Sequence, residues 1–248
     1  MNFLKELSRE NEAQQRIILH QAERELYRES LYHLAKYGLG YKDINLHTHG
    51  DVLSVLQSST TRKLIVLPKG SLKSTIVSIA YPIWLLIKNP NHRILIDSEL
   101  YTNSKNFLRE IKGHLGNSAL TSLYGPFRDP RKIRNWTEGE ITIAQRTEIK
   151  KESSITCSGI GTEKTSQHYT VCIFDDPNSR KNSATKEGRQ KVIDHYRMFT
   201  SLLDPGGILV VVGTRYAEDD LIGHIIANEI DKGISNEVGH RIRGRIQT

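Results

Sequence analysis

One segment of the chain combines the residue types that bind phosphate and magnesium. It reads Leu67-Pro-Lys-Gly-Ser-Leu-Lys-Ser-Thr75 and lies between a predicted strand and a predicted helix. A phosphate-binding loop needs inward-pointing backbone N–H groups, a lysine for the β- and γ-phosphates and a hydroxyl for Mg²⁺. Lys73 and Ser74 supply the last two. The candidate nucleotide-binding residues are therefore Pro68, Lys69, Gly70, Ser71, Leu72, Lys73, Ser74 and Thr75.

The glycines of this segment differ from the usual pattern G-x-x-x-x-G-K-[ST]. Leu67 and Leu72 stand where glycines are expected, and Gly70 is internal. The alternative interpretation is a helix that starts with a capping serine and carries a lysine in its first turn.

Two acidic residues follow a second apolar run. Asp175 and Asp176 come directly after residues 171–174, which have the pattern of a buried strand. In a parallel sheet, ligands bind at the carboxyl ends of the strands. Asp175 is the candidate for holding Mg²⁺ together with Ser74, and Asp176 for orienting an attacking water. The alternative is a pair of acids that cap a helix.

A third apolar run, residues 210–212, ends in Gly213, Thr214, Arg215 and Tyr216. Thr214 could sense the γ-phosphate or the water that attacks it. Arg215 could neutralise negative charge that develops during phosphoryl transfer. The candidate catalytic residues are thus Asp176, Lys73, Thr214 and Arg215. An ordinary strand-to-helix turn with a surface arginine is the alternative for this third signal.

The elements that must position these residues alternate between strand and helix. Apolar runs at 63–67, 93–96, 170–174 and 208–212 predict buried strands, and residues 74–87, 99–115, 185–203 and 218–230 predict helices. This alternation indicates an α/β fold with a mostly parallel sheet covered by helices on both faces. Pro82 is expected to kink its helix. Helix-forming residues fill 2–37, and a polar turn at 47–51 precedes a short helix over 51–57.

Composition excludes several classes of protein. The 248 residues are 37% hydrophobic, which excludes wholesale disorder, and the net charge of +7 fits a nucleic-acid partner without requiring one. Two cysteines 15 positions apart, Cys157 and Cys172, exclude a disulfide framework and a zinc knuckle. No apolar run reaches the roughly 20 residues of a membrane span. We expect a cytosolic protein without a membrane partner.

Taken together, these blocks resemble the ATPase domain of a tailed-bacteriophage terminase large subunit, the motor that packages DNA. The resemblance runs from about residue 49 to residue 223. It includes LPKGSLKST, YPIWLLIKNPNHRILI, TSQHYTVCIFDDP and LLDPGGILVVVGTRYAEDDLIG, in this order. The GTRY-x-x-DDL block is fairly specific for this family.

The resemblance implies a P-loop NTPase with one extra strand between the phosphate-loop strand and the acidic strand. It also implies ATP and Mg²⁺ as ligands, with Lys69 reaching the γ-phosphate or restraining the loop, and Thr214 coupling hydrolysis to movement. Many relatives have Glu at the position of Asp176. Some place a trans-acting arginine near Lys164, where this chain has none; Arg215, Arg146 and Lys164 all stay open as substitutes.

The expected function is an ATP-hydrolysing motor domain that moves double-stranded DNA into a procapsid in the host cytoplasm. The resemblance implies a homo-oligomeric ring, a portal protein and a terminase small subunit as partners. It also implies a nuclease domain beyond residue 248, so nuclease activity is not expected of this chain, which we expect to be a truncation. The expected organisation is an N-terminal helical segment at 1–50, the ATPase domain at 51–232 and a tail or linker at 233–248.

Three alternatives remain open from the residues. One is a helicase-like ATPase that separates nucleic-acid strands. A second is an assembly module with a catalytically weak or inactive phosphate loop, suggested by the missing glycines. The third is a DNA-binding protein without catalysis, whose binding would be salt-sensitive and indifferent to ATP.

Overall fold

The structure, a computed structural model, describes residues 2–131, 136–162, 166–230 and 242–243. A seven-stranded sheet with the strand order β3-β4-β2-β5-β6-β1-β7 lies at its centre. The strands are β1 (Arg62–Val66), β2 (Ile94–Ser98), β3 (Glu140–Ile141), β4 (Ile155–Gly159), β5 (Tyr169–Asp175), β6 (Leu203–Gly213) and β7 (Ile242–Arg243). Neighbouring strands are parallel except β3 and β4. The predicted α/β class with a mostly parallel sheet is confirmed.

Strand β6 lies between β1 and β5, although it follows both in the sequence. Val211 of β6 is in register with Leu64 of β1 on one side and with Phe174 of β5 on the other. Because all three strands run in the same direction, their carboxyl ends meet at one edge of the sheet. The segments after residues 66, 175 and 213 therefore lie next to one another.

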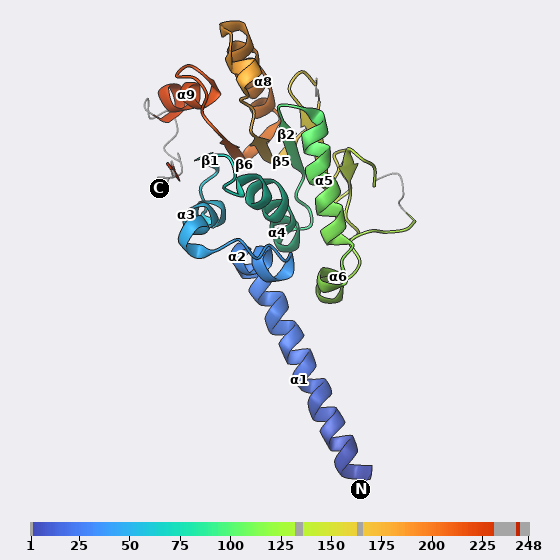
Figure 1. Cartoon of the computed structure of the whole chain (residues 1–248). Helices are drawn as coiled ribbons and strands as arrows, with labels where there is room; N and C mark the ends of the chain where they lie inside the picture. Colours follow the sequence, from blue (N-terminus) through green and yellow to red (C-terminus); the bar gives the residue numbers. More distant parts are fainter. Residues whose placement is uncertain (1, 132–135, 163–165, 231–241, 244–248) are drawn as a thin grey trace.

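Helices cover both faces of the sheet (Figure 1). One face packs against α2 (Leu31–His33), η1 (Leu34–Gly38), α3 (Leu46–Gln57), η2 (Thr75–Ala80), α4 (Tyr81–Lys88) and α5 (Tyr101–Leu115). The other packs against α8 (Lys186–Ser201), α9 (Leu221–Ile225) and η4 (Ile226–Ile230). The short helix α6 (Ser118–Tyr124) adds Leu120 and Leu123 to the hydrophobic cluster of the first face, and α7 (Arg180–Ser183) precedes α8.

Alternation along β5 decides which face each of its side chains enters. Val171 and Ile173 join the hydrophobic cluster of the α4 face, whereas Cys172 and Phe174 join that of the α8 face. The two-residue period of a strand then assigns Asp175 to the α4 face. This is the face on which the helix after residues 67–72 packs.

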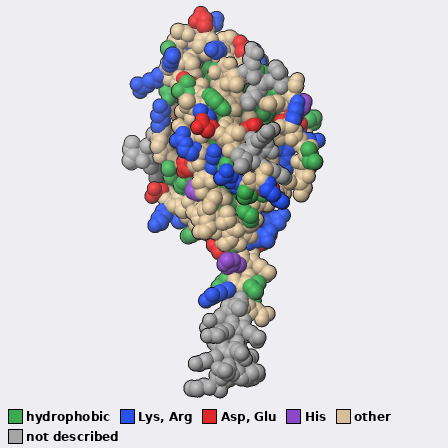
Figure 2. Space-filling view, turned by 90° about the vertical axis from the view of Figure 1, so that its right-hand side faces the viewer, with side chains coloured by type: hydrophobic (Ala, Val, Ile, Leu, Met, Phe, Trp, Pro, Cys, Tyr) green, Lys and Arg blue, Asp and Glu red, His purple; other side chains and the backbone are tan. Residues whose placement is uncertain are grey.

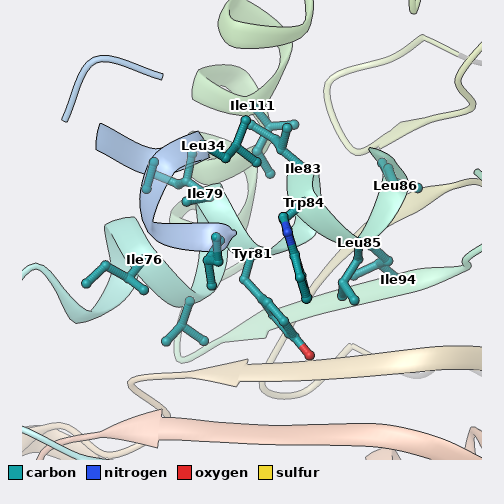
Figure 3. Packing of buried hydrophobic residues seen from close by; sticks show 14 of the residues in the cluster. Leu34, Ile76, Ile79, Tyr81, Ile83, Trp84, Leu85, Leu86, Ile94 and Ile111 are labelled. Atoms are coloured by element: carbon teal, nitrogen blue, oxygen red, sulfur yellow. The ribbon is translucent and has the colours of Figure 1, made fainter. Parts of the chain in front are cut away.

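The helix after that segment is continuous from residue 73 to 88 but widens over Thr75–Ala80 into π-helical geometry. Its wide turn ends where the N–H of Tyr81 donates to the carbonyl of Ile76. Pro82 follows immediately, and because proline has no N–H it cannot continue the ordinary i to i−4 pattern. The sequence therefore predicted an irregularity at the right place, and the structure shows that it is a π turn. Figure 3 shows this helix packed among Leu34, Ile94 and Ile111.

The N-terminal region differs in part from its prediction. Helix α1 (Asn2–Glu29) projects from the rest of the molecule in Figure 1, and near its C-terminal end the Tyr124 hydroxyl donates to the carbonyl of Arg24 at 2.7 Å. The predicted polar turn at 47–51 is wrong, because α3 already begins at Leu46. Asn45 caps it by accepting the N–H of Thr48 at 2.9 Å. The boundary expected after residue 50 consequently lies inside α3.

Two further expectations concern the chain end and membranes. Of the expected tail at 233–248, only residues 242–243 are described, and they form the edge strand β7 beside β1; the rest lies outside the described residues. Among the described residues, no helix combines the length and apolar character that crossing a bilayer requires.

A glycine pair tests how tightly β4 packs on α5. A Cβ on Gly159 would lie 2.4 Å from the backbone N of Tyr101, whereas a Cβ on Gly113, within α5, meets nothing within 4 Å. We expect Gly159→Ala to lower the free energy of unfolding by about 1–3 kcal/mol. Gly113→Ala should raise it by about 0.5–1 kcal/mol, because alanine is the better helix former. Urea unfolding followed by circular dichroism measures both, and equal effects would contradict the close approach.

Candidate active site

Residues 67–75 and the two acids Asp175 and Asp176 come together at the carboxyl edge of the sheet. The hydroxyl of Ser74 donates to Oδ1 of Asp175 at 2.9 Å, and Nζ of Lys73 lies 3.9 Å from Oδ2 of Asp176. These residues are about a hundred positions apart in the sequence. The structure therefore brings together the lysine, the hydroxyl and both carboxylates that the sequence analysis singled out.

Thr214 joins this group from the end of β6. Its backbone N–H donates to Oδ1 of Asp176 at 3.2 Å, and its hydroxyl donates to the carbonyl of Leu67 at 3.1 Å. The N–H of Leu67 in turn donates to the carbonyl of Gly213 at 3.2 Å. Thr214 thus connects the beginning of the loop to the second acid, and the three strand ends form one hydrogen-bonded unit.

The backbone of the loop turns through two left-handed residues. Gly70 has φ of +81° and Leu72 has φ of +52°, and Leu72 then accepts the N–H of Ile76 at 3.0 Å as the helix begins. The hydroxyl of Ser71 donates to the carbonyl of Pro68 at 2.8 Å, which closes the turn. Leu72 is one of the two positions where the usual motif has glycine, and its backbone adopts a conformation that glycine favours.

The exposed part of the loop carries Lys69. Its Nζ lies 5.7 Å from the centre of the Tyr216 ring, and hydrogen bonding to Tyr216, with a smaller attraction from Asp176, raises the pKa of Lys69 above its usual value. Thr75, the last residue of the candidate set, begins the π-helical turn. Lys69 is therefore next to the site but not inside it, in keeping with a role at its rim.

Asp175 is the most deeply buried ionisable group of the site. Only 1% of its surface is exposed, and burial is the main reason that its pKa rises from 3.8 to about 6, although hydrogen bonds from Ser78 and Ser74 and the charge of Lys73 oppose the rise. A buried carboxylate whose negative charge is not fully balanced by hydrogen bonds and positive charges attracts a cation, because a bound divalent ion would reverse the local balance of charge.

The oxygen donors present fit Mg²⁺ better than a softer metal. The hydroxyl of Ser74 and the carboxylate of Asp175 are hard oxygen ligands, which Mg²⁺ prefers. Among the described residues there is no group of three or more His, Cys, Asp or Glu side chains that could hold a metal by itself.

The three residues that could replace the trans-acting arginine, Arg215, Arg146 and Lys164, lie in different places. Arg215 is exposed, and its guanidinium donates to the carbonyls of Ala217 and Glu218 at 3.2 and 2.9 Å in its own turn. Arg146 donates to the carbonyl of Glu152 at 2.6 Å, which lies before β4 and hence at the opposite edge of the sheet. Lys164 lies outside the described residues.

Sequence reasoning missed one side chain that contacts the acids. Ser78 is fully buried, and its hydroxyl donates to Oδ2 of Asp175. A serine four residues after Ser74 in an otherwise apolar run was the available signal, since residues four apart share a helix face. Without the sheet in place, nothing in the sequence indicated that this face points to Asp175.

Comparison with known proteins adds no assignment. Models of known protein families do not match the chain, and no curated protein is significantly similar to it.

The buried acid predicts how stability depends on pH. Because the folded state holds the proton of Asp175 more tightly than the unfolded chain does, ionisation between about pH 4 and pH 6 should destabilise the ligand-free protein, by up to about 3 kcal/mol above pH 7. Asp175→Asn removes this ionisation. The free energy of unfolding of Asp175→Asn, minus that of the wild type, should therefore increase as the pH rises from about 4 to about 6.

Urea unfolding of both proteins at several pH values measures this difference. Asp194→Asn, which removes an acid from the surface of α8, is the control, since the Asp194 side chain is 59% exposed. A difference between Asp175→Asn and the wild type that stays constant from pH 4 to pH 8 would contradict the assigned cause.

Proposed function

We propose that this chain is an Mg²⁺-dependent ATPase of the P-loop class and the motor domain of a terminase large subunit, which moves double-stranded DNA into a procapsid. The observation that carries the proposal is the contact between Ser74 and Asp175, with Lys73 beside Asp176. It joins a loop-to-helix segment to a strand end about a hundred residues away, as binding of one metal-bound triphosphate requires. The position of β6 between β1 and β5 supports the same class.

The residues of the site have distinct roles in this proposal. Mg²⁺, when bound, neutralises charge on the β- and γ-phosphates. Ser74 and Asp175 hold it, and Lys73, whose side chain is only 7% exposed, offers its ammonium group to the same phosphates. Asp176, whose side chain is 32% exposed, is accessible enough to orient a water molecule. Thr214, directly after β6, donates its N–H to Asp176, so a movement of Asp176 would be transmitted to β6.

DNA as the partner rests on the resemblance and on charge. The chain carries a net charge of +7, and Lys and Arg side chains outnumber Asp and Glu on the face shown in Figure 2. Positive charge of this kind binds a phosphate backbone without regard to base sequence, as a motor that moves along DNA needs. The ring of copies, the portal protein, the terminase small subunit and the host cytoplasm are part of the proposal through the resemblance alone.

Removal of the lysine tests the nucleotide site directly. Lys73→Ala should lower the rate of phosphate release from Mg·ATP by at least about 100-fold, because the charge that offsets the transferred phosphoryl group is lost. Lys191→Ala, which changes an exposed lysine of α8, should leave the rate unchanged. Phosphate release is measured with and without duplex DNA. Hydrolysis by Lys73→Ala at the wild-type rate would refute the site, and no hydrolysis by the wild type would favour the inactive assembly module.

A substitution of Asp176 distinguishes a role in catalysis from a role in nucleotide binding. Asp176→Asn keeps the shape of the side chain but removes the charge that orients water. It should bind Mg·ATP with an affinity close to that of the wild type and hydrolyse it at least about 100-fold more slowly. Calorimetric titration and phosphate release give the two quantities. Loss of binding in this variant would instead give Asp176 a structural role through Thr214.

A further inference from the structure

Two serines of one helix hold the two oxygens of the same carboxylate. Ser74 donates to Oδ1 of Asp175 at 2.9 Å, and Ser78 donates to Oδ2. Ser78 is 0% exposed and Asp175 is 1% exposed. Each oxygen of the buried acid thus has its own hydroxyl donor, and the orientation of the carboxylate is fixed from both sides.

The partner of Ser78 is not the usual one for a helical serine. In a helix interior, a serine hydroxyl commonly bonds to the carbonyl four residues earlier. Ser78 lies in the π-helical turn before Pro82, and its hydroxyl instead reaches a carboxylate on the neighbouring sheet. A hydrogen bond to an ionised group is roughly twice as strong as one between neutral groups. The hydroxyl therefore holds Asp175 with a stronger bond than the one it would make to a carbonyl of its own helix.

Packing alone does not account for a serine at this position. Its neighbours Val77, Ile79 and Ala80 are all buried and apolar, so an alanine would fill the same space without a polar atom. The hydroxyl is useful only because Asp175 is beside it.

We propose that Ser78 is a positioning residue for the magnesium site, an inference that rests on the proposed function. By holding Oδ2, the Ser78 hydroxyl keeps Oδ1 of Asp175 turned toward Ser74. Oδ1 and the hydroxyl oxygen of Ser74 then lie side by side, where both are available to Mg²⁺. Without Ser78, the carboxylate can rotate about its Cβ–Cγ bond and Oδ1 no longer has a single orientation. Affinity for the metal then falls, whereas contacts of the loop with phosphate remain.

The experiment measures Mg²⁺-dependent binding of a fluorescent ADP analogue, which needs no hydrolysis. Ser78→Ala should raise the Mg²⁺ concentration needed for half-maximal binding about 10–100-fold, as loss of such supporting bonds does elsewhere. Binding of the analogue in EDTA should stay as in the wild type. In steady-state hydrolysis, the same variant should need more Mg²⁺ but approach the wild-type kcat when Mg²⁺ is saturating.

Ser104→Ala is the matched control. Ser104 is also 0% exposed, but its hydroxyl donates to the backbone carbonyls of Tyr101 and Ser158, away from the acids. It should leave the Mg²⁺ requirement unchanged. Ser78→Thr returns a hydroxyl and should recover most of the affinity, while Ser78→Cys keeps the volume with a weaker donor and should give an intermediate value.

The outcomes separate this inference from the function on which it rests. Failure of the wild type to bind Mg·ADP would overturn both. Binding by the wild type with the same Mg²⁺ requirement in Ser78→Ala, or an equal change in Ser104→Ala, would overturn the role of Ser78 alone. If Ser78→Ala does not fold by circular dichroism, Ser78→Cys decides, and a wild-type Mg²⁺ requirement in that variant overturns the inference.

Discussion

The site depends on a carboxylate that is buried at the end of a central strand. An ionised acid removed from water costs several kcal/mol unless charges and hydrogen bonds replace its hydration. Asp175 receives two hydroxyl donors and lies near Lys73, yet its pKa is still raised to about 6. The ligand-free protein therefore carries an incompletely compensated charge. A divalent cation, as proposed for this site, would supply the missing compensation, so the stability lost by burying the acid would favour binding of the cation.

Strand order is what makes this placement possible. β6 separates β1 from β5, so the loop after β1 and the acids after β5 are one strand apart rather than adjacent. Thr214, at the end of β6, fills that gap and bonds to both sides. A displacement of Asp176 must consequently alter the bond that Thr214 makes to it. The same geometry that closes the site thus gives it a mechanical connection to a central strand.

Local pattern was sufficient to single out residues that follow strands. Asp175 and Asp176 come directly after one apolar run, and Lys73 and Ser74 lie at the end of the short loop after another. Parallel strands bring such positions to one edge of the sheet. The same reasoning could not find Ser78, because its role depends on which helix face meets β5. It also could not show that the Arg215 guanidinium bonds to its own turn, since the choice between ligand and backbone is made by tertiary structure.

The leucine that stands at position 72, where the usual motif has glycine, has a physical explanation. A left-handed backbone costs an ordinary residue about 1–2 kcal/mol, and glycine avoids that cost. Leu72 adopts this backbone without being glycine, but its side chain packs against the hydrophobic cluster of the α4 face. Burial of part of a leucine contributes an amount of similar size, about 1–2 kcal/mol. The loop can thus keep a left-handed turn at residue 72 without glycine, because packing of the leucine side chain offsets the strain that glycine would have avoided.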